Sequence, residues 1–240
     1  MTDATGAAGH LDIAGVFEKT TDIYKRCFTT VWLVALILMI PSSIIVALLG
    51  DNGGLQFLGS LINLAVSAWL VGSIVRIVED VEADGRVDHP VGEVLGSVLP
   101  RLLPLIALQF VIGIGVGIGL VLLIVPGIIL ALMWIVAVPA FVVEGRGVFD
   151  SLSRSSELTS GNRMRILAIG LIVLVVYGLV WVLSALLTAA APLLGVLVMI
   201  AIAVLTYPYV SIITAVLYFR LREVKGGAAG SPVVEPNPAA

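Results

Sequence analysis

Long uncharged stretches dominate this chain and restrict what it can fold into. A helix needs about 20 apolar residues to cross the hydrocarbon core of a membrane, and a backbone in lipid must satisfy its own hydrogen bonds. Because the stretches lack the alternating pattern of barrel strands, they predict helices. The expected fold class is therefore all-α, a polytopic membrane helix bundle. The uncharged stretches are residues 28–50, 55–75, 102–143, 166–191 and 193–219.

Composition agrees with this class. Charged residues make up 12% of the chain and the mean hydropathy is +1.15, so there is too little polar surface to cover a soluble globule. The net charge of −3 offers no basic surface for nucleic acid. The single cysteine, Cys27, cannot form a disulfide within the chain.

The third stretch, 102–143, holds 42 residues, about twice the length of one span. We expect it to form a hairpin of two helices. The break is predicted between Gly119 and Pro126, since glycine tolerates a turn and proline in a first helical turn sacrifices no hydrogen bond. The chain is therefore expected to have six transmembrane helices.

The positive charges predict the orientation. All thirteen Lys and Arg fall in four segments, which lie on one side of the membrane if there are six spans. The positive-inside rule assigns that side to the cytoplasm, so we expect a multi-pass protein of the inner (cytoplasmic) membrane with both termini inside and Asp51 outside. The four sets are Lys19, Lys25 and Arg26; Arg76, Arg86 and Arg101; Arg146, Arg154, Arg163 and Arg165; and Arg220, Arg222 and Lys225.

The two ends of the chain have a different composition from the rest. Residues 1–10 are small and polar, and 226–240 are rich in Gly, Ala and Pro, so both are expected to be disordered tails. No cleavable signal is evident in the first ten residues. The membrane domain is predicted to occupy 11–225.

Three inner segments have helical amphipathic patterns typical of helices that lie on a membrane surface. Each precedes an odd-numbered span, and two begin alike, with "GVFE" at 15–18 and "GVFD" at 147–150. A threefold repeat of interfacial helix plus hairpin would explain the arrangement; alternatively, charged linkers beside membranes become amphipathic without any repeat. The apolar stripes are Ile13, Val16, Phe17, Thr20, Tyr24 and Cys27; Val91, Val94, Leu95, Val98, Leu99 and Leu102; and Phe149 and Leu152.

Four motifs resemble a known family. They are "IVPGIIL" at 124–130, "PAFVVEG" at 139–145, "SLSRSSELTSG" at 151–161 and "LYFRLR" at 217–222. Together they resemble the membrane domain of glycerophosphoryl diester phosphodiesterases, over about residues 11–225. The resemblance implies six transmembrane helices, which in that family stand alone or precede a catalytic domain. Arg220 departs from the family, where an acid is common.

The resemblance does not extend to catalysis. Phosphodiesterase chemistry of that family requires a soluble domain with paired histidines and metal-binding carboxylates. Fifteen residues follow Lys225, and the chain has two histidines, His10 and His89. We therefore expect no enzyme activity, no cofactor and no catalytic residues.

Two motifs imitate ligand sites. Asp80, Glu82, Asp84, Gly85 and Asp88 match a calcium loop, but Val91 replaces the bidentate Glu of its twelfth position, so a solvated acidic turn is favoured and no metal is expected. The glycines of 113–119 lie within an apolar run without a neighbouring lysine. They are predicted to serve helix packing or a hinge rather than phosphate binding. The packing or hinge positions are Gly113, Gly117, Pro126 and Gly127.

Polar side chains within the spans are few. Asn63 and Gln109 are the main ones, and hydrogen bonding between helices is the favoured role. Arg154 is the leading candidate for a lipid phosphate, because a guanidinium binds phosphate in bidentate fashion; the alternative is an ion pair with Asp150 or Glu144. The other headgroup candidates are Arg163, Arg165, Arg220 and Arg222.

These observations favour a non-enzymatic integral membrane protein that interacts with phospholipids or serves as a scaffold at the cytoplasmic face. Its expected partners are membrane phospholipids and membrane-associated enzymes or transport proteins, but not nucleic acid. The alternative is a small transporter or channel for a lipid-derived or amphipathic solute, with prolines supplying helix kinks. These prolines are Pro41, Pro126, Pro139, Pro192 and Pro208.

Overall fold

A computed structural model describes residues 11–49, 53–85 and 89–229. Helices account for nearly all of these residues, and no strand occurs among them, so the all-α prediction is confirmed. Residues 1–10, 51 and 230–240, on which some of the predictions fall, lie outside this part of the chain. The elements are α1 Ile13–Leu49, α2 Gly53–Asp84, α3 Val91–Val98, the short 3₁₀ helix η1 Leu99–Arg101, α4 Leu102–Leu122, α5 Ile124–Trp134, α6 Ala137–Glu144, α7 Val148–Thr159, α8 Arg163–Ala190 and α9 Pro192–Ala229.

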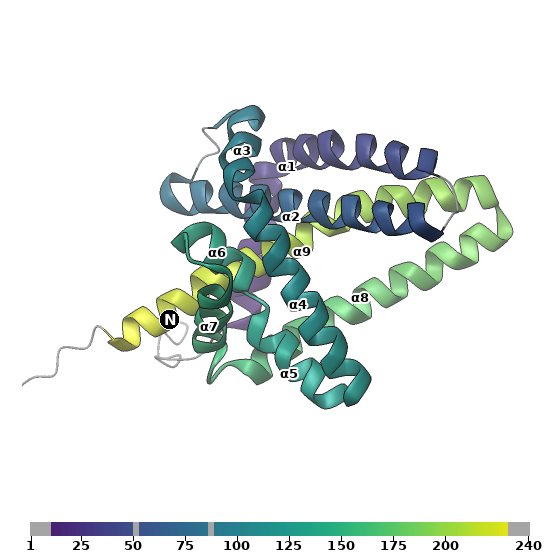
Figure 1. Cartoon of the computed structure of the whole chain (residues 1–240). Helices are drawn as coiled ribbons and strands as arrows, with labels where there is room; N and C mark the ends of the chain where they lie inside the picture. Colours follow the sequence, from purple (N-terminus) through teal and green to yellow (C-terminus); the bar gives the residue numbers. More distant parts are fainter. Residues whose placement is uncertain (1–10, 50–52, 86–88, 230–240) are drawn as a thin grey trace, which may run out of the picture.

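Three antiparallel helix pairs form the body of the molecule. The pairs α1–α2, α4–α5 and α8–α9 pack closely, and α9 also contacts α1 and α2. The first and third pairs extend side by side in one direction, while α4–α5 diverges from them (Figure 1). The short helices α3, α6 and α7 gather at the opposite end, which we call the short-helix end.

Five helical segments of the described chain are long and apolar enough to cross a membrane. They begin or end close to the predicted spans, and the class of membrane protein is thereby supported. The sixth predicted span, 193–219, lies within the continuous helix α9. The five segments are Ile13–Leu49, Gly53–Ala83, Val91–Leu122, Ile124–Glu144 and Arg163–Ala190.

The hairpin break falls where the sequence predicts it. Leu123 has an extended backbone with φ −158° and ψ 132°, and it separates α4 from α5. A side chain on Gly127 would come within 2.5 Å of the Leu120 backbone nitrogen, so only glycine permits this approach of the two helices. Gly127 therefore has the packing role predicted for it. Pro126 occupies the first turn of α5, where it loses no hydrogen bond.

The packing prediction is wrong for Gly113 and Gly117. A side chain at either position would meet no atom within 4 Å, so no neighbouring helix approaches them. The alternate glycines of the same run make the contacts instead: Gly115 faces the Trp134 ring, and Gly119 faces Gly127. A spacing of four predicts the small face of a helix but not which of two such faces meets a partner.

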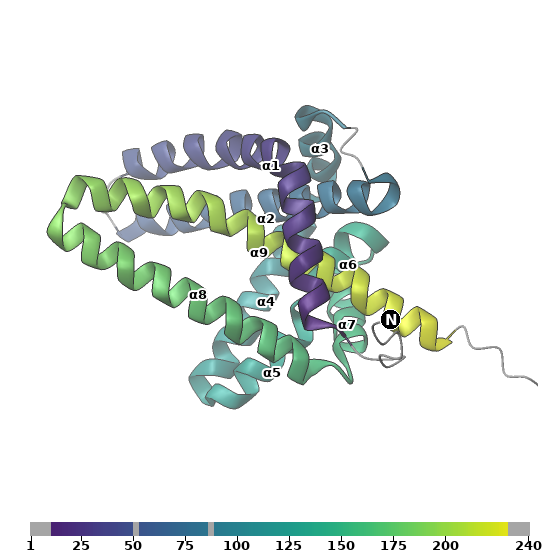
Figure 2. The same cartoon turned by 180° about the vertical axis from the view of Figure 1, so that it is seen from behind.

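The amino-terminal segment is not a separate helix. α1 runs unbroken from Ile13 to Leu49, because no proline precedes Pro41 and its one glycine, Gly15, lies in the first turn. Its first part nevertheless crosses the other helices before the chain turns to run beside α2 (Figure 2). Val16, Thr20 and Cys27 of the predicted stripe are fully buried, so this stripe faces protein.

Both ends of the described chain are fastened to the turn between α7 and α8. The Leu11 backbone nitrogen donates to Asn162 Oδ1 at 3.1 Å, and Arg165 donates to the Leu11 carbonyl at 2.6 Å. At the other end Lys225 Nζ donates to Ser160 Oγ at 2.9 Å. Helix α9 continues to Ala229, past the predicted start of the tail at 226.

Candidate functional site

Helix α7, the polar segment between two apolar runs, packs into the molecule rather than lying free on a surface. It contacts α5 and α6, and also α4 and α9. Its buried face consists of small hydroxyl residues alternating with leucines, so it fits closely against these helices while the remaining side chains face outward. The buried residues are Ser151, Leu152, Ser155, Leu158 and Thr159.

Ser155 repairs a break in the helical backbone. The chain leaves the helix between α5 and α6, which frees backbone groups near residue 135. Ser155 Oγ donates to the Met133 carbonyl at 2.7 Å and accepts from the Val136 backbone nitrogen at 3.2 Å. Because Ser155 and Val136 are fully buried, water cannot replace these bonds. Ser155 thus fixes the direction in which α6 leaves α5.

Glu144, the last residue of α6, is the centre of a charged cluster. Its Oε1 accepts from Arg154 Nε at 3.1 Å and from the Tyr218 hydroxyl at 2.9 Å, and its Oε2 pairs with Arg146 Nε. The Tyr218 side chain is fully buried. The carboxylate therefore joins α6, α7 and α9 at the short-helix end.

Arg154 has the ion pair that the sequence left as an alternative. Its partners are Glu144 and, at 3.4 Å, Glu157, rather than Asp150. Burial acts to lower the pKa of Arg154, but the hydrogen bond and charge of Glu144 outweigh it and raise the pKa above its ordinary value. Arg154 stays charged and has a structural role in this cluster.

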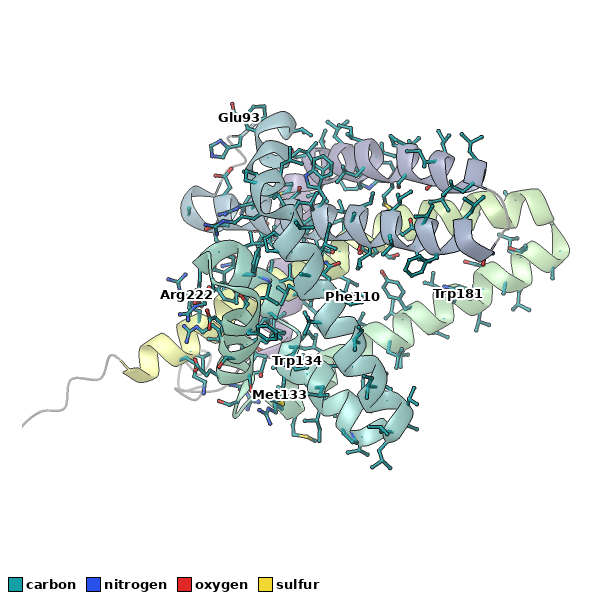
Figure 3. The ribbon with its side chains drawn as sticks, viewed as in Figure 1. Glu93, Phe110, Met133, Trp134, Trp181 and Arg222 are labelled. Carbon is teal, nitrogen blue, oxygen red and sulfur yellow. The ribbon has the colours of Figure 1, made fainter. Side chains whose placement is uncertain are left out.

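The remaining headgroup candidates divide into two groups. Arg165 donates to the Leu11 carbonyl, and Arg220 pairs with Glu223 at 3.2 Å. Arg163 and Arg222 have no ion pair with any described residue, and the Nε of Arg163 is buried without a hydrogen bond. Arg222 is exposed, and Figure 3 shows it beside α6 and α9.

Arg101, which the sequence analysis did not single out, belongs to the same region. Gly145 ends α6 with φ 66°, a left-handed conformation that favours glycine. A side chain at Gly145 would come within 2.7 Å of Arg101 Nη1, so the guanidinium lies directly over this glycine. In the sequence, the "EG" at the end of "PAFVVEG" was the available signal for the turn at Gly145, since glycine after a helix marks a turn.

A groove of about 930 Å³ lies between the α4–α5 hairpin and the α8–α9 hairpin, with α2 behind it. Figure 1 shows that α4 and α8 diverge from each other. Several lining side chains remain exposed, such as Leu174 at 65%, so the groove is open along its side. Its walls are mainly apolar. Gly113 and Gly117 form part of them, and neither has a side chain that would fill the groove.

A small set of neutral polar groups interrupts the apolar walls. Gln109 Oε1 accepts from Ser67 Oγ at 3.2 Å, and Ser67 also interacts with the Tyr207 hydroxyl. Tyr177 contributes from α8 on the opposite side of the groove. The structure thus brings Gln109 to the groove, whereas Asn63 lines a separate hollow of about 390 Å³ between α1 and α2.

The first part of the acidic motif at 80–88 is helical rather than a loop. Helix α2 continues to Asp84, and side chains two residues apart on a helix point to different faces. Glu82 pairs with Lys19 at 2.5 Å, and Asp80 lies 3.6 Å from His89 Nε2. Residues 86–88 lie outside the described chain. Among the described residues no group of three His, Cys, Asp or Glu side chains is arranged to hold a metal ion.

Comparison of the chain with protein-family models, with curated proteins and with solved structures gives no match.

Proposed function

We propose that this chain is a six-span, non-enzymatic protein of the inner (cytoplasmic) membrane that binds a membrane lipid in the groove between α4–α5 and α8–α9. The groove carries the proposal. Its volume of about 930 Å³ lies in the size range of small-molecule sites, roughly 300–1,000 Å³. It opens sideways from helices long enough to span the bilayer, so acyl chains are the molecules that meet it.

The lining of the groove suits an amphipathic occupant. Most of the wall is aliphatic, while Gln109, Tyr177 and Tyr207 supply neutral donors and acceptors. Among the described residues, no Asp, Glu, His, Lys, Arg or Cys lines the groove. Apolar walls with a few polar groups hold and orient a ligand, and the absence of charge in the wall favours binding over proton transfer.

The proposed topology has α9 as the sixth span and the short-helix end in the cytoplasm. In this arrangement α3 and α7 lie at the inner membrane surface, as their amphipathic patterns predict, and α6 forms the inner end of the fourth span. The start of α1 and the end of α9 both lie at the α7–α8 turn, which agrees with an even number of crossings. Scaffolding of membrane-associated enzymes by this face is part of the proposal.

A transporter for an amphipathic solute is the second candidate, and the length of the groove favours it. The lining extends from Gln109 to Leu120 along α4, about 17 Å at 1.5 Å per residue. Of the five prolines proposed as kinks, however, Pro126, Pro139 and Pro192 begin helices, and only Pro41 and Pro208 lie well inside one. Lipid transfer between leaflets of reconstituted vesicles separates transport from static binding.

Filling the groove is expected to weaken lipid binding. A Cβ at Gly113 or Gly117 would meet no atom within 4 Å, so a leucine there would extend into the groove and occupy volume needed by an acyl chain. We expect about tenfold weaker phospholipid binding, equal to about 1.4 kcal/mol, in native mass spectrometry of delipidated protein titrated with lipid. Gly178→Leu is the control, since Gly178 also meets open space but lies outside the groove. Equal binding by all variants would contradict the proposed site.

Cysteine labelling tests the topology. In a Cys27→Ser background, the Gly53→Cys variant is expected to react with a membrane-impermeant maleimide. The reagent is added to cells whose inner membrane is intact and whose outer permeability barrier has been removed. A cysteine at Ser153, exposed on α7, is expected to react only after the membrane is opened. Labelling of both positions from the same side would exclude the proposed arrangement, because the two lie on opposite sides of an odd number of spans.

A further inference from the structure

We propose that an arginine cluster at the short-helix end binds the phosphate group of an anionic phospholipid. The cluster consists of Arg101, Arg146, Arg154 and Arg222. The inference rests on the proposed function, because it identifies the headgroup class of the lipid whose chain occupies the groove. It follows from the arrangement of charges around Gly145 and not from the groove itself.

The four arginines come from three helices and the connection between α6 and α7. Arg146 and Arg154 both contact Glu144, and Arg101 lies over the neighbouring Gly145. Arg222 follows Tyr218 by four residues on α9, so the two side chains share a face of the helix, and the Tyr218 hydroxyl donates to Glu144. Residues distant in sequence, on η1, α7 and α9 and after α6, therefore place guanidinium groups around one point.

The carboxylates nearby do not occupy all four guanidinium groups. Glu144 accepts from Arg146 and Arg154, Glu157 adds a contact to Arg154, and Asp150 lies in the first turn of α7. Arg101 and Arg222 make no ion pair with a described residue, and both are exposed. Each guanidinium carries five N–H donors, and two of the four are thus available for an anion that accepts several hydrogen bonds.

Exposed apolar side chains beside these arginines indicate what the anion belongs to. Leu99 and Leu103 flank Arg101, and Leu103 is 78% exposed. Phe149, close to Arg146 in sequence, is 75% exposed. Large apolar side chains next to charged ones are favourable at the boundary between acyl chains and headgroups. The anion at this level is a lipid phosphate, whose oxygens match the planar fork of a guanidinium.

The cluster and the groove are correctly spaced for one lipid. Thr214 lines the inner part of the groove, and Arg222 follows it by eight residues on the same helix, about 12 Å further along the axis. A phospholipid can therefore place its phosphate against the cluster while an acyl chain enters the groove. Helix α9 runs from the groove to the arginine cluster.

The test removes the two guanidinium groups that Glu144 does not hold. We compare the wild type with the double variant Arg101→Gln/Arg222→Gln, in which the Glu144 contacts stay intact. Delipidated protein is titrated in native mass spectrometry with phosphatidylglycerol and diacylglycerol of identical chains. The wild type is expected to prefer phosphatidylglycerol by about tenfold, and the double variant by less than about twofold. Arg26→Gln is the control, because Arg26 is an exposed arginine paired with Asp22 and its loss removes charge elsewhere.

Each outcome decides between the possibilities. Unchanged preference in the double variant, or an equal loss in Arg26→Gln, overturns the headgroup assignment; the proposed function still stands if Gly113→Leu weakens binding of both lipids. No lipid bound to the wild type overturns the proposed function itself. A third arm adds inorganic phosphate at millimolar concentration and measures thermal unfolding. The lipid assignment is wrong if phosphate stabilises the wild type but not the double variant, while phosphatidylglycerol stabilises neither. The site would then bind a soluble anion.

Discussion

Replacing Glu144 by alanine is expected to destabilise the folded protein by about 2 kcal/mol, less than the cost of breaking a fully buried ion pair, because the Glu144 and Arg154 side chains are partly exposed. The substitution leaves Arg154 and the fully buried Tyr218 hydroxyl without their acceptor. Cys27, the single cysteine, is fully buried and reports unfolding through its reaction with a thiol-specific dye. The measurement is the shift of the unfolding midpoint in a denaturant titration of the detergent-solubilised protein.

Glu223→Ala is the matched control for this prediction. Glu223 also pairs with an arginine, Arg220, but both side chains are well exposed, so the expected loss is about 0–1 kcal/mol. Combining Glu144→Ala with Tyr218→Phe should cost about 1 kcal/mol less than the sum of the two, since the hydrogen bond is lost only once. Equal effects of Glu144→Ala and Glu223→Ala would show that the charged cluster does not hold α6, α7 and α9 together.

Ser155→Ala is expected to cost about 2–3 kcal/mol, because one buried and one part-buried backbone group each lose a partner, and an unsatisfied buried group costs about 1–3 kcal/mol. These groups are the Met133 carbonyl and the Val136 nitrogen. Ser153→Ala, on the exposed face of the same helix, should change stability by less than about 0.5 kcal/mol. Both variants are compared through labelling of Cys27.

Ser155→Ala should also weaken lipid binding. Trp134 and Val138, on either side of the break that Ser155 bridges, line the groove. A loosened break would let these walls move. If Ser155→Ala lowers stability without reducing the amount of bound lipid, the break between α5 and α6 does not determine the shape of the groove.

Much of the architecture follows from the distribution of apolar residues. Runs without charge identify the long helices, and the combination of glycine and proline within 119–126 predicts the break at Leu123. These features are local, since they depend on span length and on backbone geometry. A single sequence therefore contains them directly.

The candidate site depends on contacts between distant residues, which periodicity does not encode. Gln109 and Tyr207 are recognisable as polar residues in spans, but their meeting in one groove depends on how α4 diverges from α8 and α9. The stripe of Ser151, Ser155 and Thr159, spaced by four, was a usable signal for a closely packed helix face. Its partner, the break between α5 and α6, has no equally clear signature, because Ile135 and Val136 are ordinary apolar residues.

The attachment of both chain ends to the α7–α8 turn has a consequence for biosynthesis. Leu11 is made early, but Asn162 and Arg165, which hold it, are synthesised about 150 residues later. In the proposed topology, the first hairpin enters the bilayer before the contacts that hold Leu11 can form. The late contact closes a long loop, at an entropic cost that grows only slowly with loop length. Nascent chains that stop before Asn162 are thus unable to lock their first helix, and emergence of the third hairpin completes the assembly.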